Sequence, residues 1–87
     1  MKWQIKIERK AQKAIKKIPN PYQSNIIQAI NELSKDPRPE RCKKLKGVAD
    51  IWRIRVSDYR IVYQIKDNQL KVVVIRIGHR SDIYDNL

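Results

Sequence analysis

The segment IWRIRVSDYRIVYQI, which begins at residue 51, alternates bulky apolar side chains with arginines. Successive side chains of a β-strand point to opposite faces, so Arg53 and Arg55 share one face while the residues between and beside them share the other. The alternation breaks at Ser57-Asp58 and then resumes. This pattern predicts two strands, at about 51–57 and 59–66, each with an apolar face that forms one wall of a core.

Two more segments show the same period of two. Trp3, Ile5 and Ile7 alternate with polar residues near the start of the chain, which predicts a short, half-buried strand. Another strand is expected at about 70–77, after the polar connection Lys66-Asp67-Asn68-Gln69. Because the connections between the last three strands are short, these strands should pair antiparallel in sequence order.

Between the first strand and the others the period changes to that of a helix. From Ala11 to Ile18 the apolar residues fall at i, i+3, i+4 and i+7, and lysines occupy the opposite face. Pro19-Asn20-Pro21 ends this helix, because proline cannot continue a helix and restricts the residue before it. A second helix with the same spacing is expected at about 21–35, since proline suits the first turn of a helix.

The elements in order are β-α-α-β-β-β. This order predicts an α+β fold in which a helical hairpin packs on one face of a small, mainly antiparallel twisted sheet. A chain of 87 residues supports one compact core, and it shows no repeat, low-complexity tract or linker. Residues 1–87 are therefore expected to form a single domain.

Charge is the strongest compositional feature. Lysine and arginine number 20 against nine acidic residues, which gives a formal net charge of +11. Such a domain should attract polyanions such as RNA, DNA or an acidic protein. A membrane surface is not the expected partner, because the basic residues lie on predicted strands as well as on helices.

Location follows from what the sequence lacks. The longest apolar run, Val72 to Ile75, is far shorter than the roughly 20 residues of a membrane-spanning helix. The N-terminal segment MKWQIKIERK has no apolar signal-peptide core, and the single cysteine, Cys42, allows no intrachain disulfide. The cytoplasm is the expected location.

Several familiar kinds of site are excluded. The only glycines are Gly47 and Gly78, so no glycine-rich phosphate loop is present, and one histidine with one cysteine cannot by themselves complete a zinc site. Asp82 and Asp85 are expected to be exposed tail residues or to pair with Arg80. We expect neither a metal nor a cofactor.

The remaining group of chemically active side chains is cationic. Arg53 and Arg55 lie on one strand face, and Arg60 follows across the predicted hairpin. If strands 51–57 and 59–66 flank 70–77, these arginines should converge on one concave basic surface with residues on or after the last strand, namely Arg76, His79, Arg80 and Tyr84. The alternative is that the helices cover the apolar face while the arginines only solvate the other, as in many half-exposed sheets.

The segment KLKGVADIWRIRVSDYRIVYQI, followed by VVVIRIGHRSDIY, closely resembles the RelE-type toxins of the RelE/ParE toxin–antitoxin superfamily. The resemblance extends over essentially all 87 residues. It rests on the combination of Leu45-Lys46-Gly47, the basic pair Arg53/Arg55, the strand from Tyr59 to Tyr63, and the ending Gly78-His79-Arg80 with Tyr84. It implies the β-α-α-β-β-β fold and cleavage of messenger RNA in the ribosomal A site.

The resemblance also implies partners and chemistry. A cognate, RelB-like antitoxin that folds on binding should block the toxin, and operator DNA should be reached only through that antitoxin. The RNA is cut when its own 2′-hydroxyl attacks the adjacent phosphorus, leaving a 2′,3′-cyclic phosphate and a 5′-hydroxyl. Guanidinium groups suit the charge that develops on the phosphate, because their planar fork matches two phosphate oxygens.

The roles of single residues follow from the same resemblance. The family usually has lysines at the basic pair, whereas Arg53 and Arg55 stand here; an arginine is a poor proton acceptor, so both are better charge stabilisers than bases. Arg60 and Arg80 are expected phosphate contacts. His79 is suited to both proton roles, or it only caps the end of the last strand. Tyr84 positions the substrate, or it anchors the tail.

Further basic residues are expected to contact ribosomal RNA phosphates and so to fix the position of the toxin without reading sequence. They lie on the first helix, in the loop before the second strand and on the last strand: Lys10, Lys13, Lys16, Lys17, Arg41, Lys43, Lys44, Lys46 and Arg76.

Two other functions stay open on the same fold. A ParE-like toxin inhibits DNA gyrase by binding and cuts nothing, and an inactive homologue would act as a DNA-bound regulator together with its antitoxin. ParE-like members generally lack the clustered basic pair together with the tail tyrosine, so Arg53, Arg55, Arg60, Arg80 and Tyr84 together favour the nuclease. Only a test of activity separates the inactive homologue from the nuclease.

Overall fold

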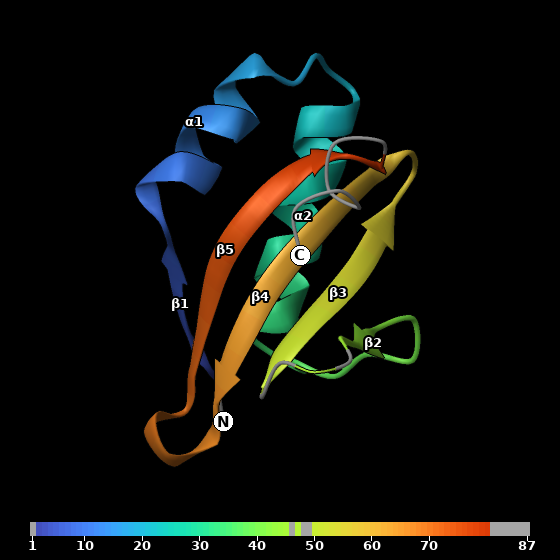
Figure 1. Ribbon diagram of the computed structural model, residues 1–87. Helices are drawn as coiled ribbons and strands as arrows, with labels where there is room; N and C mark the ends of the chain where they lie inside the picture. The colour runs from blue at the N-terminus through green and yellow to red at the C-terminus, as the bar shows by residue number, and fades with distance from the viewer. Residues whose placement is uncertain (1, 46, 48–49, 81–87) are drawn as a thin grey trace.

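The computed structural model describes residues 2–45, 47 and 50–80 (Figure 1). One sheet carries both helices on the same side (Figure 1), so the predicted α+β fold is confirmed. In chain order the elements are β1 (Gln4–Ile7), α1 (Arg9–Lys17), α2 (Tyr22–Leu33), β2 (Lys43–Lys44), β3 (Ile51–Val56), β4 (Tyr59–Lys66), the 3-10 helix η1 (Asp67–Gln69) and β5 (Lys71–His79).

The strand order of the sheet is β1-β5-β4-β3-β2. As predicted, β3, β4 and β5 pair antiparallel in sequence order, while β1 pairs parallel with β5. The expectation that the segments 51–57 and 59–66 flank 70–77 is wrong, because β4 lies between β3 and β5. Two successive short connections build a meander, which puts its middle strand in the centre and leaves the outer edge of β5 to β1.

The helices follow the predicted pattern. Helix α1 ends at Lys17, just before the Pro19-Asn20-Pro21 segment, and α2 begins directly after it. The side-chain amide of Gln23 donates a 2.9 Å hydrogen bond to the carbonyl of Ile15, which ties the start of α2 to the end of α1. The apolar stripes of both helices face the sheet because their apolar residues recur at helical spacing.

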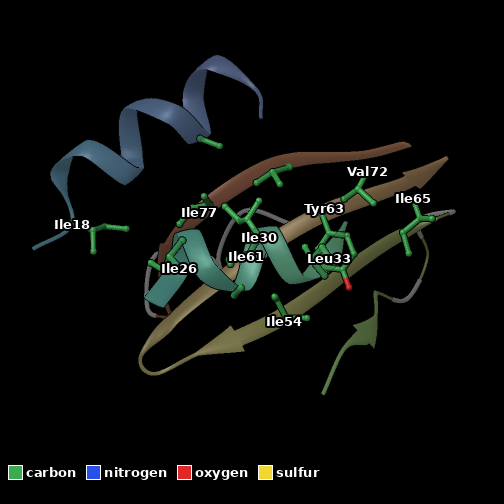
Figure 2. Packing of buried hydrophobic residues seen from close by; sticks show 13 residues of the cluster. Ile18, Ile26, Ile30, Leu33, Ile54, Ile61, Tyr63, Ile65, Val72 and Ile77 are labelled. Atoms are coloured by element: carbon green, nitrogen blue, oxygen red, sulfur yellow. The ribbon is translucent and has the colours of Figure 1, made fainter. Parts of the chain in front are cut away.

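The main core lies between the helices and the sheet (Figure 2). In the register of the strands, Ile54 stands opposite Ile61, and Ile61 stands opposite Ile77, so all three side chains point to the helices. Ile26 and Leu33 of α2 pack against this row and are almost completely buried. Burial of these side chains is the main contribution that holds the helices on the sheet.

A register shift between Val62 and Tyr63 changes the faces of β5. Val62 pairs with Arg76 and Tyr63 pairs with Val74, so Ile75 is an extra residue in β5. Such a bulge reverses which face every later residue of the strand occupies. It therefore determines the side of the sheet on which the end of β5 presents its side chains.

The face of the sheet away from the helices is partly apolar and partly cationic. Ile51 and Val62 are buried there, with Leu45 and Ile75 packed against them. Beside this small cluster, the register of β3 and β4 puts the predicted arginines on the same face. One part of this face is therefore covered by packed apolar side chains, and the part nearer the β3–β4 hairpin carries charged side chains.

Candidate active site

Three arginines meet on the face of the sheet away from the helices. Arg55 stands directly opposite Arg60 in the β3–β4 register, and Arg53 lies two residues back along β3. The predicted common face of Arg53 and Arg55 is confirmed, and Arg60 joins them. Like charges that face each other across two strands destabilise a sheet. The pairing of Arg55 with Arg60 is thus costly for folding and suits a surface that binds an anion.

These arginines line a cavity of about 270 Å³. Among the residues that the structure describes, those that line it are all cationic: Arg41, Lys43, Arg53, Arg55 and Arg60. We call it the five-cation cavity. Side chains of this kind concentrate positive potential in a concave space, where it attracts anions far more strongly than scattered surface charges do.

Arg60 is the most buried of the five, with 5% of its surface exposed. Its Nη1 donates a 3.2 Å hydrogen bond to the carbonyl of Tyr59, and the residue opposite it on β5 is Gly78, which has no side chain. Arg55 is exposed, and its Nε donates a 3.2 Å bond to the carbonyl of Ser57 in the hairpin. A positive charge held in such a buried position interacts with an anion in a lower dielectric than water.

The remaining two cations come from the segment between α2 and β3. Lys43 belongs to β2 and stands opposite Arg53. Arg41 lies just before it and approaches Glu32 of α2, with 3.5 Å between Nη2 and Oε2. Both side chains of that ion pair are about half exposed, so the pair contributes little to stability. Its effect is to hold the Arg41 side chain over the edge of the sheet.

The start of this segment is anchored at the opposite end of the sheet. Arg38 forms a two-pronged contact with Asp67, at 2.8 and 3.1 Å, and its guanidinium lies 5.2 Å from the ring centroid of Trp52. The hydrogen bond from Arg38 lowers the pKa of Asp67. The buried Tyr63 hydroxyl donates a 2.8 Å bond to the carbonyl of Pro37, and burial raises the pKa of that phenol. These contacts fix the point from which β2 approaches β3.

His79 does not join the arginines. It pairs with Tyr59, whose ring packs against the helix-covered core, so the expectation that His79 converges with Arg53, Arg55 and Arg60 is wrong. The cause is the extra residue Ile75: strict alternation along β5 would have put His79 on the arginine face. The ring of His79 instead lies edge-on to that of Tyr59, with 5.8 Å between the centroids.

The other predicted residues are distributed over the molecule. Arg76 pairs with Val62 and so shares the face of the five-cation cavity, although it does not line it. Arg80 is exposed, and its backbone N–H donates a 2.8 Å bond to the carbonyl of Asp58. Tyr84 and Lys46 lie outside the described residues. The lysines of α1 are exposed on the helix-covered side: Lys10, Lys13, Lys16 and Lys17.

Metal ligands do not gather in the part of the chain that the structure describes. No group of three or more His, Cys, Asp and Glu side chains in that part could hold a metal ion. In the same residues, neither helix has the length and apolar character needed to cross a bilayer.

Comparison with known proteins identifies the family. The profile described as the ParE toxin of the type II toxin-antitoxin system parDE matches residues 5–84. A putative RelE-like toxin protein of Escherichia coli is 32% identical over 98% of this chain and 93% of its own length. The chain belongs to the RelE/ParE superfamily. It is a RelE-type toxin of a type II toxin-antitoxin system, as the sequence resemblance implied.

Two further comparisons support this assignment. The mRNA interferase toxin RelE of E. coli K12 is 31% identical to this RelE-type toxin, over 97% of the chain and 92% of the relative. In the crystal structure of the intact E. coli RelBE toxin-antitoxin complex, a chain 28% identical superimposes with a TM-score of 0.78, covering 88% of this chain and 95% of that one.

The sequence had not assigned Arg41 and Lys43 of this RelE-type toxin to the same cavity as the arginines. Both were predicted as ribosome contacts on a loop. The missed element is β2, which has only two residues and is too short to show a period of two. The run of cations around Lys43 and Lys44 was the only signal in the sequence, and it does not reveal which strand these residues approach.

The opposed pair Arg55 and Arg60 gives a testable effect on stability. Replacing Arg55 by glutamine removes a like-charge contact worth about 0.2–1 kcal/mol. We therefore expect Arg55→Gln to have a free energy of unfolding equal to that of the wild type or higher by up to about 1 kcal/mol, measured by urea denaturation at low salt. A loss of stability would contradict this account and would show that Arg55 supports the fold.

Proposed function

We propose that this RelE-type toxin is an endoribonuclease that cuts messenger RNA in the A site of the ribosome and so stops translation in the cytoplasm. The observation that carries the proposal is the five-cation cavity, where Arg55 and Arg60 stand opposite each other on neighbouring strands. Two relatives named mRNA interferases support it, at 31% identity. The bond is broken by attack of the RNA 2′-hydroxyl on the adjacent phosphorus.

The cavity supplies the electrostatic part of this reaction. The attacked phosphate gains negative charge in the transition state, and preorganised cationic donors stabilise that charge. Arg60 is placed best because it is buried, while Arg53 and Arg55 approach the same space from β3. Each guanidinium binds two phosphate oxygens in its plane but is a poor base. We assign these three residues to charge stabilisation, with Arg80 as a further phosphate contact beside the hairpin.

Proton transfer has to come from elsewhere. Because His79 lies on the opposite face of the sheet, we do not assign it the proton of the 2′-hydroxyl. Tyr84, which matches the tail tyrosine of the family, would position the substrate and is one candidate for a proton role. The ribosome is the other, since it surrounds the messenger at the A site.

Docking on the ribosome would use the other cations. The exposed lysines of α1 lie on the helix-covered side, and the basic segment before β3 lies at the edge of the sheet. Phosphate contacts of this kind fix orientation and carry no sequence information. The residues in this role are Lys10, Lys13, Lys16, Lys17, Lys44, Lys46 and Arg76, with Arg41 and Lys43 shared with the cavity.

The regulatory partner would be a RelB-like antitoxin. Toxin chains similar to this one are found in complexes with RelB-type antitoxins from E. coli and from Mycobacterium tuberculosis. A chain of net charge +11 suits an acidic or amphipathic segment that folds as it binds. Operator DNA would be contacted through the antitoxin.

Charge pairing with the antitoxin should control the rate of association. We expect the association rate constant of toxin and antitoxin to fall by at least about tenfold between low and high ionic strength, because salt screens attraction between exposed charges. Stopped-flow fluorescence over a range of salt concentrations measures this rate. An association rate that does not change with salt would contradict the expected acidic partner.

The proposed function is tested by the chemistry of the RNA ends. Purified toxin is added to ribosomes that carry a defined messenger, and the fragments are analysed for a 5′-hydroxyl and a 2′,3′-cyclic phosphate. These ends at an A-site codon support the proposal. Intact messenger together with inhibition of DNA supercoiling by gyrase would instead indicate a ParE-like function. Intact messenger and unaffected gyrase would indicate an inactive homologue.

A further inference from the structure

A second cavity, of about 300 Å³, lies on the helix-covered side of the sheet. Its walls come from α1 and from the adjoining ends of β4 and β5, and they include Ala14, Lys17, Ile18, Tyr59, Ile77 and His79. Its volume is at the lower end of the roughly 300–1,000 Å³ of small-molecule sites. Nothing in the reaction proposed above uses this cavity.

One wall of the cavity is aromatic. The rings of Tyr59 and His79 are 5.8 Å apart and nearly perpendicular, and the ring of Tyr22 lies 5.7 Å from that of Tyr59. We call these three residues the aromatic cluster. Tyr22 is 40% exposed, and Tyr59 and His79 are half-buried, so the cluster is open to solvent on one side. Ala14, Ile18 and Ile77 add small and aliphatic side chains to the lining of the same cavity.

The surroundings of this cavity are cationic. Lys17 forms part of the wall, and Lys10, Lys13 and Lys16 are exposed on the same helix. Helix α1 contains no acidic residue. Aromatic side chains beside a positively charged track are the combination with which proteins hold single-stranded nucleic acid, because every base has a face that stacks and every linkage carries a charge.

The second cavity lies behind the five-cation cavity, on the opposite face of the sheet. Tyr59 and Arg60 are successive residues of β4, so their side chains leave the sheet on opposite faces. Gly78 and His79 of β5 stand opposite Arg60 and Tyr59 in the same way. The two cavities therefore lie back to back at the end of the sheet that carries the β3–β4 hairpin. An RNA strand that passes around this end would contact both.

We propose that the cavity between α1 and the aromatic cluster binds one unpaired base of RNA, with its phosphate on Lys17. This inference rests on the proposed function, because it gives the ribonuclease a second contact with RNA. An apolar side chain of an antitoxin would also fit between these walls. RNA is favoured because a single nucleotide satisfies both the stacking surface and the lysines of α1.

The test separates a stacking ring from a proton donor at position 79. His79→Phe keeps an aromatic ring and removes the titratable nitrogens, whereas His79→Gln keeps polarity and removes the ring. The probe is a single-stranded RNA hexamer that is 2′-O-methylated, so that it resists cleavage, and contains one 2-aminopurine. Quenching of 2-aminopurine fluorescence reports stacking, and titrations of the full-length toxin at several salt concentrations give Kd.

We expect His79→Gln and Tyr59→Leu to raise Kd by about 5- to 150-fold, the range measured for the loss of one stacked base. The dependence of Kd on salt should stay unchanged, because no phosphate contact is removed. His79→Phe, which keeps an aromatic ring, should bind the hexamer and quench its fluorescence like the wild type. Tyr22 packs against Tyr59 and is not among the described residues that line the cavity, so Tyr22→Leu should raise Kd less than Tyr59→Leu. Ile27→Ala, at another exposed position of the same helix, is the control.

Experiments on ribosome-bound toxin show whether the bound base belongs to the messenger or to ribosomal RNA. Quenching of a 2-aminopurine in a non-cleavable messenger identifies the messenger, and protection of a ribosomal base that depends on Tyr59 identifies ribosomal RNA; either result supports the proposal. Unchanged Kd and quenching in His79→Gln, Tyr59→Leu and Tyr22→Leu would overturn it, as would variants that lose only antitoxin binding. If the variants bind RNA and cleave messenger like the wild type, this proposal fails but the proposed function stands. If RNA binding depends on the aromatic rings but no cleavage occurs, the nuclease proposal is refuted and the RNA-binding site is retained.

Discussion

Replacing Arg60 by glutamine is expected to slow cleavage of ribosome-bound messenger RNA by about 10²–10³-fold, the usual cost of removing one preorganised charge-stabilising donor. Arg60 is the most buried cation of the five-cation cavity, and the residue opposite it on β5 is Gly78, which has no side chain. Its charge therefore acts where water screens it least. The effect should appear in the single-turnover rate at saturating toxin, because docking uses the many other cations of the chain.

Two further variants make this prediction specific. Arg60→Lys keeps the charge but loses the planar fork, so its rate should fall between those of the wild type and Arg60→Gln. Lys35→Gln removes one exposed cation outside the cavity and should cleave at the wild-type rate. If the cleavage rate of Arg60→Gln fell no further than that of Lys35→Gln, the cavity would not be the site of phosphate stabilisation.

Cleavage of free RNA is expected to be slower than cleavage on the ribosome by about 10³-fold or more, because the cavity stabilises charge but does not hold the RNA strand in line. The described lining of the five-cation cavity consists of four arginines, which are poor proton acceptors, and one exposed lysine, Lys43. We therefore propose that the ribosome supplies the bent geometry of the messenger and part of the proton transfer.

The comparison uses one messenger sequence with and without ribosomes, at saturating toxin and equal salt. Equal single-turnover rates in the two reactions would contradict ribosome dependence and would mean that the toxin alone aligns its substrate. In that case the search for a base would return to the chain itself, beginning with Tyr84.

The periodicity of the chain predicted which side chains share a face, and the short connections predicted that the last three strands pair in sequence order. Arg53 and Arg55 alternate with apolar residues, so their common face followed from the geometry of any strand. The Ser57-Asp58 hairpin placed Arg60 on the next strand, and the register confirms it. The central place of β4 follows from the two short connections on either side of it, which the expectation that 51–57 and 59–66 flank 70–77 overlooked.

Two local features were not visible in the sequence. The two-residue strand β2 brings Lys43 opposite Arg53, and a strand of this length has no recognisable pattern. The bulge at Ile75 turns His79 to the helix-covered face and Arg76 to the other. A bulge depends on the fit between neighbouring strands, so strict alternation gives the wrong face for every residue that follows it.

We expect the scissile phosphate to lie in the five-cation cavity. A structure of the toxin on a ribosome whose messenger carries a 2′-O-methyl group at the cleavage site tests it directly. In such a structure this phosphate should lie within salt-bridge distance of the guanidinium of Arg60, on the face away from the helices. A scissile phosphate bound instead on the α1 side, beside His79 and Lys17, would contradict it.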